Sequence, residues 1–269
     1  MEQTPQAEHI GLLFDPRSTL DELAGQRRRF AAAVEGLSEE ELAAPSRCAE
    51  WTVADVLRHL VWVDRTMRRI WAGERAIPKD FDARITPNDA VRDERAVSDK
   101  EIRERYLTST TAMAAELEGA DPERFGLPSR SPAGPVPWWM SAVHIGWDSA
   151  VHERDVLLPL GLTSQPSSAE VEVCLAYSLV LTSFFAGADP LSVRVGTVAL
   201  SRDDGPVVVR PATGEQTSRS PEAAIAVPDP VAAIDALSGR GPVEESMAGD
   251  AAVIHRLGGL ARYFTTVPG

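Results

Sequence analysis

Lysine is nearly absent from this 269-residue sequence. Lys79 and Lys100 are its only lysines, and even with 25 arginines its 27 basic residues are outnumbered by 40 acidic ones, which leaves a formal net charge of −13. Binding to nucleic acid or to an anionic membrane surface depends on clustered Lys and Arg, so we expect neither partner. The Arg-rich, Lys-poor composition also indicates a GC-rich bacterial genome as the source.

Cysteine is equally scarce, with only Cys48 and Cys174. Two cysteines do not make a disulfide framework at this length, which favours a reducing compartment. The first nine residues, MEQTPQAEH, have neither the basic nor the apolar region of a signal peptide, so we expect a cytoplasmic protein. The longest apolar stretch, from Val173 to Ala188, is short for a membrane span and is interrupted by Ser and Thr. It predicts a core helix instead.

Helical periodicity dominates the first 160 residues. It predicts four main helices, at about 19–34, after residue 52, at 99–117 and at 137–158, and a short helix after Ser38. The second of the four has the clearest start, because Thr52 as N-cap and Asp55 three residues later form a capping-box pattern. Pro137 is expected at the first position of the fourth helix. Residues 78–97 and 128–137 lack a period and are predicted to be loops.

The pattern changes after a linker at 163–170. A helix is predicted at about 169–186, followed by two strands, SVRVGTVAL and VVVR, that form a hairpin around a DDGP turn. EAAIAV is predicted to be a third strand. A short helix begins at Asp229-Pro230, and a last helix runs from Asp250 to about Tyr263. We therefore predict a mainly α protein, with a four-helix bundle at 10–162 and a smaller α+β domain at 165–269.

Three side chains form a candidate metal site. Asp148 and His152 are four residues apart on the fourth helix, so they lie on one face, about 6 Å apart at Cβ. They share that face with Trp147 and Val151, which indicates that it points inward. His59 flanks the apolar stripe of the second helix. Two imidazoles and a carboxylate suit a divalent metal with open positions. An alternative stays open, in which the three residues pair with one another in the core.

The segments CAEWTVADVLRHL (48–60) and WDSAVHERDVLLPLG (147–161) resemble the two signature regions of the mycothiol-dependent maleylpyruvate isomerase family, within the DinB/YfiT-like metalloenzymes. The resemblance implies a DinB-like four-helix bundle whose catalytic metal ligands are His59, Asp148 and His152. Asp155 matches an Asp that recurs after the family's final ligand. Residues 243–257, VEESMAGDAAVIHRL, resemble the family's sterol-carrier-like C-terminal domain.

The resemblance also implies the chemistry. In these isomerases mycothiol, an actinobacterial cosubstrate, adds to an activated double bond, the adduct rotates, and elimination gives the isomer. We expect Zn²⁺ as the metal and mycothiol as the cosubstrate of an isomerase or S-transferase acting on a small electrophile, as a monomer or homodimer. The isomerases usually have Glu where this chain has Asp148, and the shorter side chain can shift the metal by about an ångström. His144, one turn earlier, is a candidate additional or substitute ligand.

Three other functions stay open at this point. Two His and one carboxylate also describe the ligands of non-heme iron oxygenases, although those usually have β-rich scaffolds. A metal that activates water gives a hydrolase. A non-catalytic binding or regulatory protein can also have the same bundle.

The remaining reactive residues are expected to have structural roles. Cys48 is interpreted as a small apolar filler before a helix, in preference to a nucleophile, and Cys174 as a packing residue. His255 and the arginines after His59 are expected on the solvated surface; these arginines are Arg65, Arg68 and Arg69. Core packing is expected for Trp138 and Trp139, which also lie near enough to the site in sequence to line a cleft.

Overall fold

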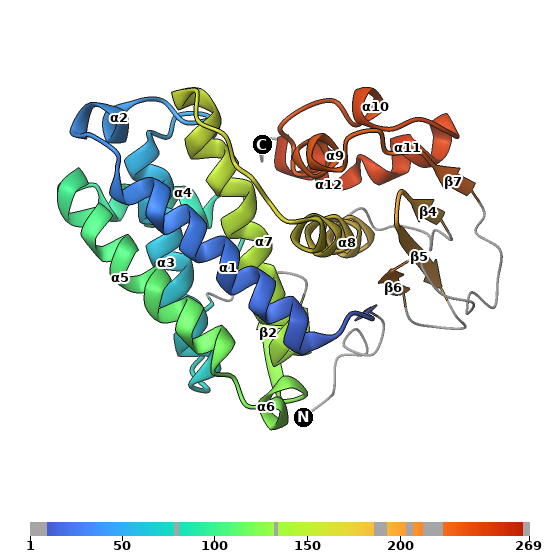
Figure 1. The fold of residues 1–269 in the computed structure, drawn as a ribbon, viewed down its shortest axis with the longest axis horizontal. Coiled ribbons are helices and arrows are strands. Elements are labelled where there is room, and N and C mark those ends of the chain that lie inside the picture. The colour runs from blue at the N-terminus through green and yellow to red at the C-terminus, as the bar shows by residue number, and fades with distance from the viewer. Residues whose placement is uncertain are drawn as a thin grey trace. The chain divides into compact units, whose positions relative to one another are not determined.

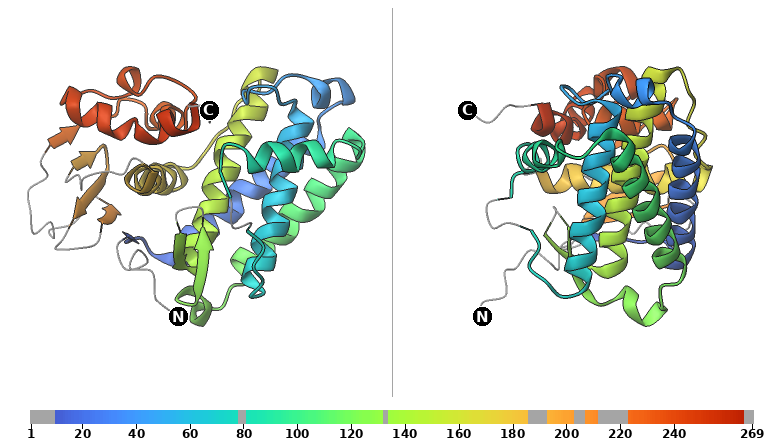
Figure 2. Two further views of the ribbon diagram at one scale, coloured as in Figure 1. Left: turned by 180° about the vertical axis from the view of Figure 1, so that it is seen from behind. Right: turned by 90° about the vertical axis from the view of Figure 1, so that its left-hand side faces the viewer.

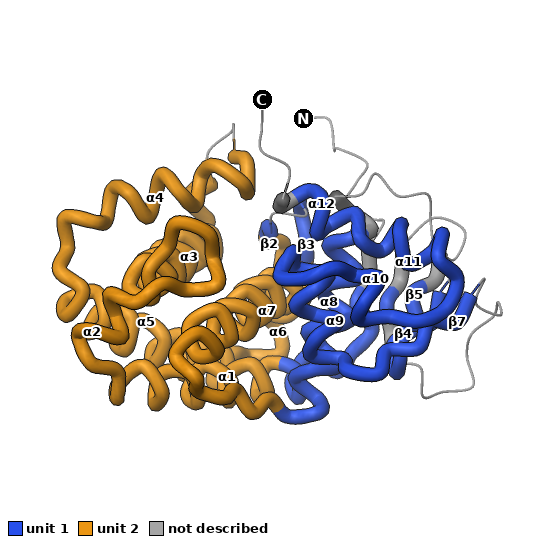
Figure 3. The backbone as a smooth tube through the Cα atoms, turned by 90° about the horizontal axis from the view of Figure 1, so that it is seen from above, with its two compact units in different colours: residues 1–19, 130–136, 167–269 blue, residues 20–129, 137–166 orange. Residues whose placement is uncertain are grey.

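The computed structural model describes residues 10–77, 81–131, 134–185, 193–202, 207–211 and 223–265. The chain divides into two compact units, shown in Figure 3. One unit contains residues 20–129 and 137–166, and the other contains residues 1–19, 130–136 and 167–269. The units are therefore interleaved in sequence, whereas the predicted domains, 10–162 and 165–269, are continuous. The predicted domain bounds stay a prediction, because the division into compact units does not test which parts fold independently.

The first unit is a bundle of four long helices, α1, α3, α5 and α7, which lie side by side in Figures 1 and 2. Their bounds are Pro16–Glu35, Val53–Trp71, Asp99–Glu118 and Trp138–Leu157. Shorter helices lie between them, namely α2 (Glu39–Ala43), α4 (Thr86–Glu94) and α6 (Pro122–Phe125), and the 3₁₀ helix η1 (Leu158–Leu160) follows α7. The four predicted helices are confirmed, each within about three residues of its expected ends.

Local capping explains where these helices begin. The Thr52 side chain accepts a hydrogen bond from the backbone N–H of Asp55, whose carboxylate accepts one from the backbone N–H of Thr52, so the predicted capping box is formed. Ser38 caps α2 in the same way. Pro137 is the N-cap of α7, one position earlier than predicted. The best-capped long helix is therefore α3, which carries His59.

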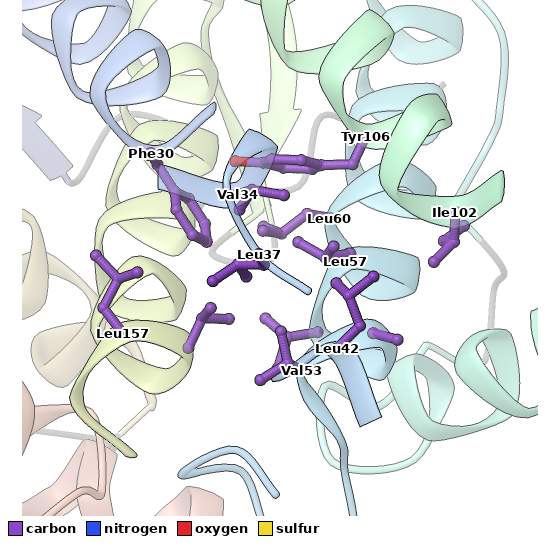
Figure 4. Packing of buried hydrophobic residues seen from close by; sticks show 13 residues of the cluster. Phe30, Val34, Leu37, Leu42, Val53, Leu57, Leu60, Ile102, Tyr106 and Leu157 are labelled. Atoms are coloured by element: carbon purple, nitrogen blue, oxygen red, sulfur yellow. The ribbon is translucent and has the colours of Figure 1, made fainter. Parts of the chain in front are cut away.

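Apolar side chains fill the space between the helices. Figure 4 shows one cluster, in which Phe30 of α1 packs edge-on against Tyr106 of α5 at a ring-centroid distance of 5.4 Å. The cluster also includes Leu57 and Leu60 of α3 and Leu157 of α7, so all four long helices contribute to it. Burial of such side chains contributes about 1.5–3 kcal/mol each.

A polar network also crosses the bundle interior. The fully buried Arg27 of α1 lies 2.9 Å from the carboxylate of Asp64 in α3, and it donates a hydrogen bond to the carbonyl oxygen of Ile145 in α7 at 3.2 Å. Arg27 also reaches the hydroxyl of Thr110 in α5 at 3.5 Å, and Ser109 donates to Asp64 at 3.0 Å. This network joins all four long helices, and each buried charge in it has a partner of opposite sign.

The second unit contains a five-stranded sheet with strand order β1-β6-β5-β4-β7. The strands are Ile10–Leu12, Val207–Pro211, Val198–Arg202, Val193–Val195 and Ala223–Ile225 in that order. β1 pairs parallel to β6 and β4 parallel to β7, while β5 is antiparallel to both of its neighbours. The apolar helix α8 (Ser168–Phe185) packs against β1, β5 and β6. Four further helices complete the unit: α9 (Pro230–Leu237), α10 (Val243–Ser246), α11 (Ala251–Leu257) and α12 (Gly259–Thr265).

The predicted fold class is confirmed: the protein is mainly helical, with a helical bundle and a smaller α+β part. Four details of the prediction were wrong. Residues 86–94 form α4 within a segment predicted to be a loop, and residues 128–137 contain the paired strands β2 (Pro128–Ser131) and β3 (Gly134–Pro137). SVRVGTVAL contains two strands, because the chain turns at Gly196-Thr197. The predicted last helix is broken at Gly258 into α11 and α12.

Three further observations concern residues 10–12, the predicted DDGP turn and membrane-spanning helices. Residues 10–12, assigned to the bundle domain, form β1 and pair with β6. The DDGP turn at 203–206 lies outside the described residues. In the part of the chain that the structure describes, no helix has both the length and the apolar content needed to cross a membrane.

Candidate metal centre

Two neighbouring helices of the bundle bring the three predicted residues together. His59 lies about two turns after the start of α3, and Asp148 and His152 lie one turn apart on α7, which packs against α3. Both imidazoles are buried, and the side chain of Asp148 is 16% exposed. The carboxylate of Asp148 lies between the Nε2 atoms of the two rings.

Distances between the donor atoms fit a single ion. Oδ2 of Asp148 lies 3.3 Å from Nε2 of His59, and Oδ1 lies 3.6 Å from Nε2 of His152. Two ligand atoms bound to tetrahedral Zn²⁺ at about 2.1 Å are about 3.4 Å apart. One donor atom from each of the three residues lies within 4.8 Å of the other two. Nitrogen and oxygen donors at this spacing match the ligand chemistry of zinc, so the residues present fit the metal that the sequence predicts.

The second nitrogen of His152 has its own partner. Nδ1 lies 2.9 Å from Oδ2 of Asp155, one turn further along α7. A carboxylate can only accept a hydrogen bond, so the assigned arrangement has Nδ1–H of His152 donating. That hydrogen bond directs the lone pair of Nε2 toward Asp148. Metal-binding histidines commonly have this second hydrogen bond to a carboxylate, which orients the ring.

The charges of His152 and Asp148 stabilise each other. Burial opposes a charge on His152, but the nearby Asp148 carboxylate outweighs it, together with Cys48 and Asp155, and raises the pKa of His152 to about 10. Burial likewise opposes ionisation of Asp148, yet His59 and His152 hold the pKa of that carboxyl well below its usual range. In the absence of a metal, a proton on Nε2 of His152 therefore occupies the direction in which a cation would bind. Metal binding would release that proton.

Tryptophan side chains surround the two imidazoles. The ring of Trp51 lies 5.3 Å from that of His59 and 6.2 Å from that of His152, centroid to centroid, and Trp62 lies 6.0 Å from His59. The indole N–H of Trp51 donates to the side-chain oxygen of Asn88 in α4 at 2.9 Å. The helix that the sequence did not predict thus helps to hold an aromatic wall of the site.

The backbone beside this wall is strained. Glu50 has φ +66, in the left-handed region that side chains other than glycine rarely adopt. Such a conformation costs about 1–2 kcal/mol and persists where the surroundings hold it. Here the backbone oxygen of Glu50 accepts a hydrogen bond from Arg95 at 3.4 Å. The turn at Glu50 leads directly into Trp51.

His144 is close to the site but is not one of the three clustered donors. It lies one turn before Asp148 on α7, and its ring is stacked with Trp147 at a centroid distance of 6.1 Å. Burial lowers the pKa of His144 to about 4, although the charge of Asp148 partly opposes that shift. A neutral imidazole therefore lies next to the candidate ligands at neutral pH. A role for His144 as an additional or substitute ligand stays a prediction.

Cys48 makes contacts at the candidate site that sequence reasoning missed. It does pack against the bundle core, as a filler would. Its Sγ, however, lies 3.2 Å from Oδ2 of Asp155 and 3.7 Å from Nδ1 of His152. No spacing in the sequence signals this contact, because Cys48 is about one hundred residues away from both partners.

The other reactive residues have the expected structural positions. Cys174 is buried in α8 and His255 is exposed on α11. Trp138 is buried and packs against Trp71 at a centroid distance of 5.0 Å, while Trp139 is half-buried. The arginines after His59 form ion pairs with acidic residues at the bundle surface; the pairs are Arg65–Glu94, Arg68–Glu116 and Arg69–Glu74.

Comparisons with known proteins agree with this architecture. The crystal structure of the mycothiol-dependent maleylpyruvate isomerase is similar to this chain, with a TM-score of 0.60 over 88% of this chain and 93% of that one. A mutant of that isomerase gives a TM-score of 0.59 over the same shares. Both are 10% identical to this sequence, so the likeness shows a shared fold. None of the curated proteins searched matches the sequence.

A family match adds to the structural likeness. Residues 23–157 match the family described as the mycothiol maleylpyruvate isomerase N-terminal domain. The match spans half of the sequence and includes His59, Asp148 and His152. The chain therefore belongs to the mycothiol maleylpyruvate isomerase family.

Proposed function

We propose that this protein is a zinc-dependent enzyme that uses a low-molecular-weight thiol, mycothiol, to isomerise a small electrophilic substrate or to transfer the thiol to it. The observation that carries this proposal is the cluster of one oxygen and two nitrogen donors within 4.8 Å, supplied by two helices of the domain that matches the family. We further propose that it works in the cytoplasm, as a monomer or homodimer.

His59, Asp148 and His152 would hold the ion, and three protein ligands leave a tetrahedral position open. Zinc bound there would lower the pKa of a thiol in that position enough to remove its proton. The chain needs no cysteine of its own as nucleophile, because the cosubstrate supplies the sulfur. Asp148 brings one negative charge to the site, which leaves a zinc centre with a net positive charge that favours a bound thiolate.

The surrounding residues would control access and protons. Trp51 and Trp62 lie against the rings of His59 and His152 and limit water around them. His144 is neutral at pH 7, because burial lowers its pKa to about 4, so it can accept a hydrogen bond or a proton from an incoming thiol or substrate.

In the proposed isomerisation, the sulfur of the thiol forms a bond to one carbon of an activated double bond, and the electron pair of that double bond moves to the activating carbonyl group. The former double bond is then single and can rotate. Loss of the thiol breaks the carbon–sulfur bond and restores the double bond with the other geometry. If the enolate of the adduct instead takes up a proton at carbon and the adduct is released with the carbon–sulfur bond intact, the enzyme is an S-transferase.

The test combines metal analysis with thiol dependence. We expect protein purified without an affinity tag to contain about one zinc ion per chain, to bind mycothiol in calorimetric titration, and to isomerise maleylpyruvate only when mycothiol is present. His59→Ala and Asp148→Ala should lose zinc and activity. His255→Ala, at an exposed position on α11, is the matched control and should keep both.

Three results would overturn the proposal. Stoichiometric iron with oxygen consumption would indicate an oxygenase, and ester or amide hydrolysis without a thiol would indicate a hydrolase. Full function of Asp148→Ala without bound metal would indicate a binding or regulatory role for the bundle.

A further inference from the structure

We infer that Cys48 is a positioning residue for the metal centre: its thiol shares the carboxylate of Asp155 with His152 and thereby fixes the ring of that candidate ligand. The inference rests on the proposed metal site and adds a residue to it. It adds a hydrogen-bonding role to the packing of Cys48 against the bundle core.

The geometry around Asp155 carries the inference. Oδ2 of Asp155 accepts two hydrogen bonds, from Nδ1–H of His152 at 2.9 Å and from the thiol of Cys48 at 3.2 Å. The side chain of Asp155 is fully buried, and on its other oxygen Nε of Arg47 lies 3.7 Å from Oδ1. Since one oxygen serves both donors, the position of Cys48 limits where that oxygen, and hence the ring of His152, can lie.

The loop that carries Cys48 is itself held against α7. The backbone N–H of Arg47 donates to the carbonyl oxygen of Asp155 at 3.0 Å. Within the loop, the hydroxyl of Ser46 donates to the carbonyl oxygen of Trp51 at 2.9 Å and accepts from the backbone N–H of Cys48 at 3.1 Å. Cys48 therefore reaches Asp155 from a backbone with few alternative conformations, which is what a positioning role requires.

Two other roles for the same atoms fit less well. Sγ of Cys48, Nδ1 of His152 and an oxygen of Asp155 lie close enough to form a second group of metal donors. Nδ1 of His152 and Oδ2 of Asp155 are 2.9 Å apart, however, which is a hydrogen-bond distance and shorter than the spacing of about 3.4 Å between two ligand atoms of tetrahedral zinc. A nucleophilic role needs a sulfur directed at a substrate, whereas Sγ of Cys48 is directed at the buried carboxylate of Asp155.

The expected effect follows from how partners of metal ligands behave. Losing a direct hydrogen-bond partner of a metal-binding histidine typically weakens metal binding about 10–100-fold. Asp155→Asn removes the charge of such a partner, so we expect a loss in that range. Cys48 acts one step further away, and we expect zinc to leave Cys48→Val about 3–10 times faster than the unchanged protein. Cys48→Ser keeps a donor and should stay within about 2-fold.

The experiment measures zinc loss to a chelator from the full-length zinc-loaded protein. Val is apolar and fills the site without donating, while Ser can donate, so the pair separates hydrogen bonding from packing. Cys48→Ala provides the same comparison if the valine variant does not fold. Cys174→Val, in the buried α8 position, is the matched control and should not change the rate.

A second readout addresses positioning directly. In protein loaded with Co²⁺ in place of zinc, the exchangeable Nδ1–H proton of His152 gives a shifted NMR signal. We expect this signal to exchange with water faster in Cys48→Val than in Cys48→Ser or the unchanged protein.

Equal zinc-loss rates and equal proton exchange in Cys48→Val and the unchanged protein would overturn the inference while leaving the proposed function intact. Equal defects in Cys48→Val and Cys48→Ser would also overturn it, because packing would then explain both. If the unchanged protein held no stoichiometric metal, the proposed function would fail along with the inference.

Discussion

Asp148→Asn tests the metal centre most directly, because it keeps the shape of the side chain and removes its charge. The carboxylate lies 3.3 Å from His59 and 3.6 Å from His152, so both imidazoles lose their shared anionic partner. A zinc ion in the site would lose its one negatively charged ligand. We therefore expect this substitution to weaken zinc binding and to destabilise the metal-free protein.

The structure sets the size of the second effect. Two unit charges about 3.5 Å apart interact by about 5 kcal/mol at an effective dielectric constant of 20. Desolvation offsets part of that interaction, and breaking a buried pair by removing one partner costs about 3–5 kcal/mol. Because the side chain of Asp148 is 16% exposed, we expect about 3 kcal/mol at pH 7. His152 keeps Asp155 as a partner of opposite charge. The pKa of His152 should fall, because the charge of Asp148 no longer raises it.

Thermal and urea unfolding, each with and without zinc, measure both effects. At a zinc concentration about 100 times the dissociation constant, binding stabilises a protein by about 2.7 kcal/mol. A variant that binds about 100-fold more weakly gains only about 0.4 kcal/mol under the same conditions. Asp93→Asn, which removes an exposed carboxylate, is the control and should keep the full zinc effect. An Asp148→Asn variant that zinc stabilises as strongly as the unchanged protein would refute the assignment of this ligand.

Two further predictions concern the bundle that supports the site. Asp64→Asn leaves the buried guanidinium of Arg27 without its anionic partner and should lower the free energy of unfolding, measured with urea, by about 3–5 kcal/mol. The double change Arg27→Met with Asp64→Leu should cost less than the sum of the two single changes. An additive result would contradict the pairing. The pKa of His144, about 4, lies below its unfolded value of about 6.5, so between these two pH values the unfolded chain binds more protons and stability falls as the pH falls. His144→Phe should make that fall shallower in metal-free protein, and an unchanged slope would show that His144 does not titrate in this window.

Local sequence signals predicted the long helices well, because each is determined within a few residues of its own ends. Thr52 and Asp55 form the capping box that their spacing indicates. Local spacing also predicts half of the candidate site on α7, since residues four apart, such as Asp148 and His152, lie on one face of any helix. That the ring of His59 meets them is a property of how α3 packs on α7; its place beside the apolar stripe of α3 and the family resemblance indicated it, but no spacing along the chain did.

The missed elements lack local signals. The N-cap of α4 is Ile85, whose side chain makes no capping hydrogen bond, and Val91 is the one buried residue of this helix. With nine residues and a single buried side chain, α4 is stabilised by contacts with α3 and by the hydrogen bond from Trp51 to Asn88. β1 is three residues long and pairs with a strand nearly two hundred residues away. Tertiary contacts determine both elements, and a periodicity argument does not include them.

Cys48 marks the limit of such reasoning at the site itself. Asp155 follows His152 by three residues on a helix, so its hydrogen bond to Nδ1 of His152 is encoded locally, as the ligand spacing is. The thiol contributes to the same carboxylate from a loop far away in the chain. The candidate ligand His152 thus has a partner that the sequence pattern predicts and another that only the fold brings near. The second kind of partner differs most freely between proteins that share the same ligand spacing, so it is where members of one family can tune the same metal centre differently.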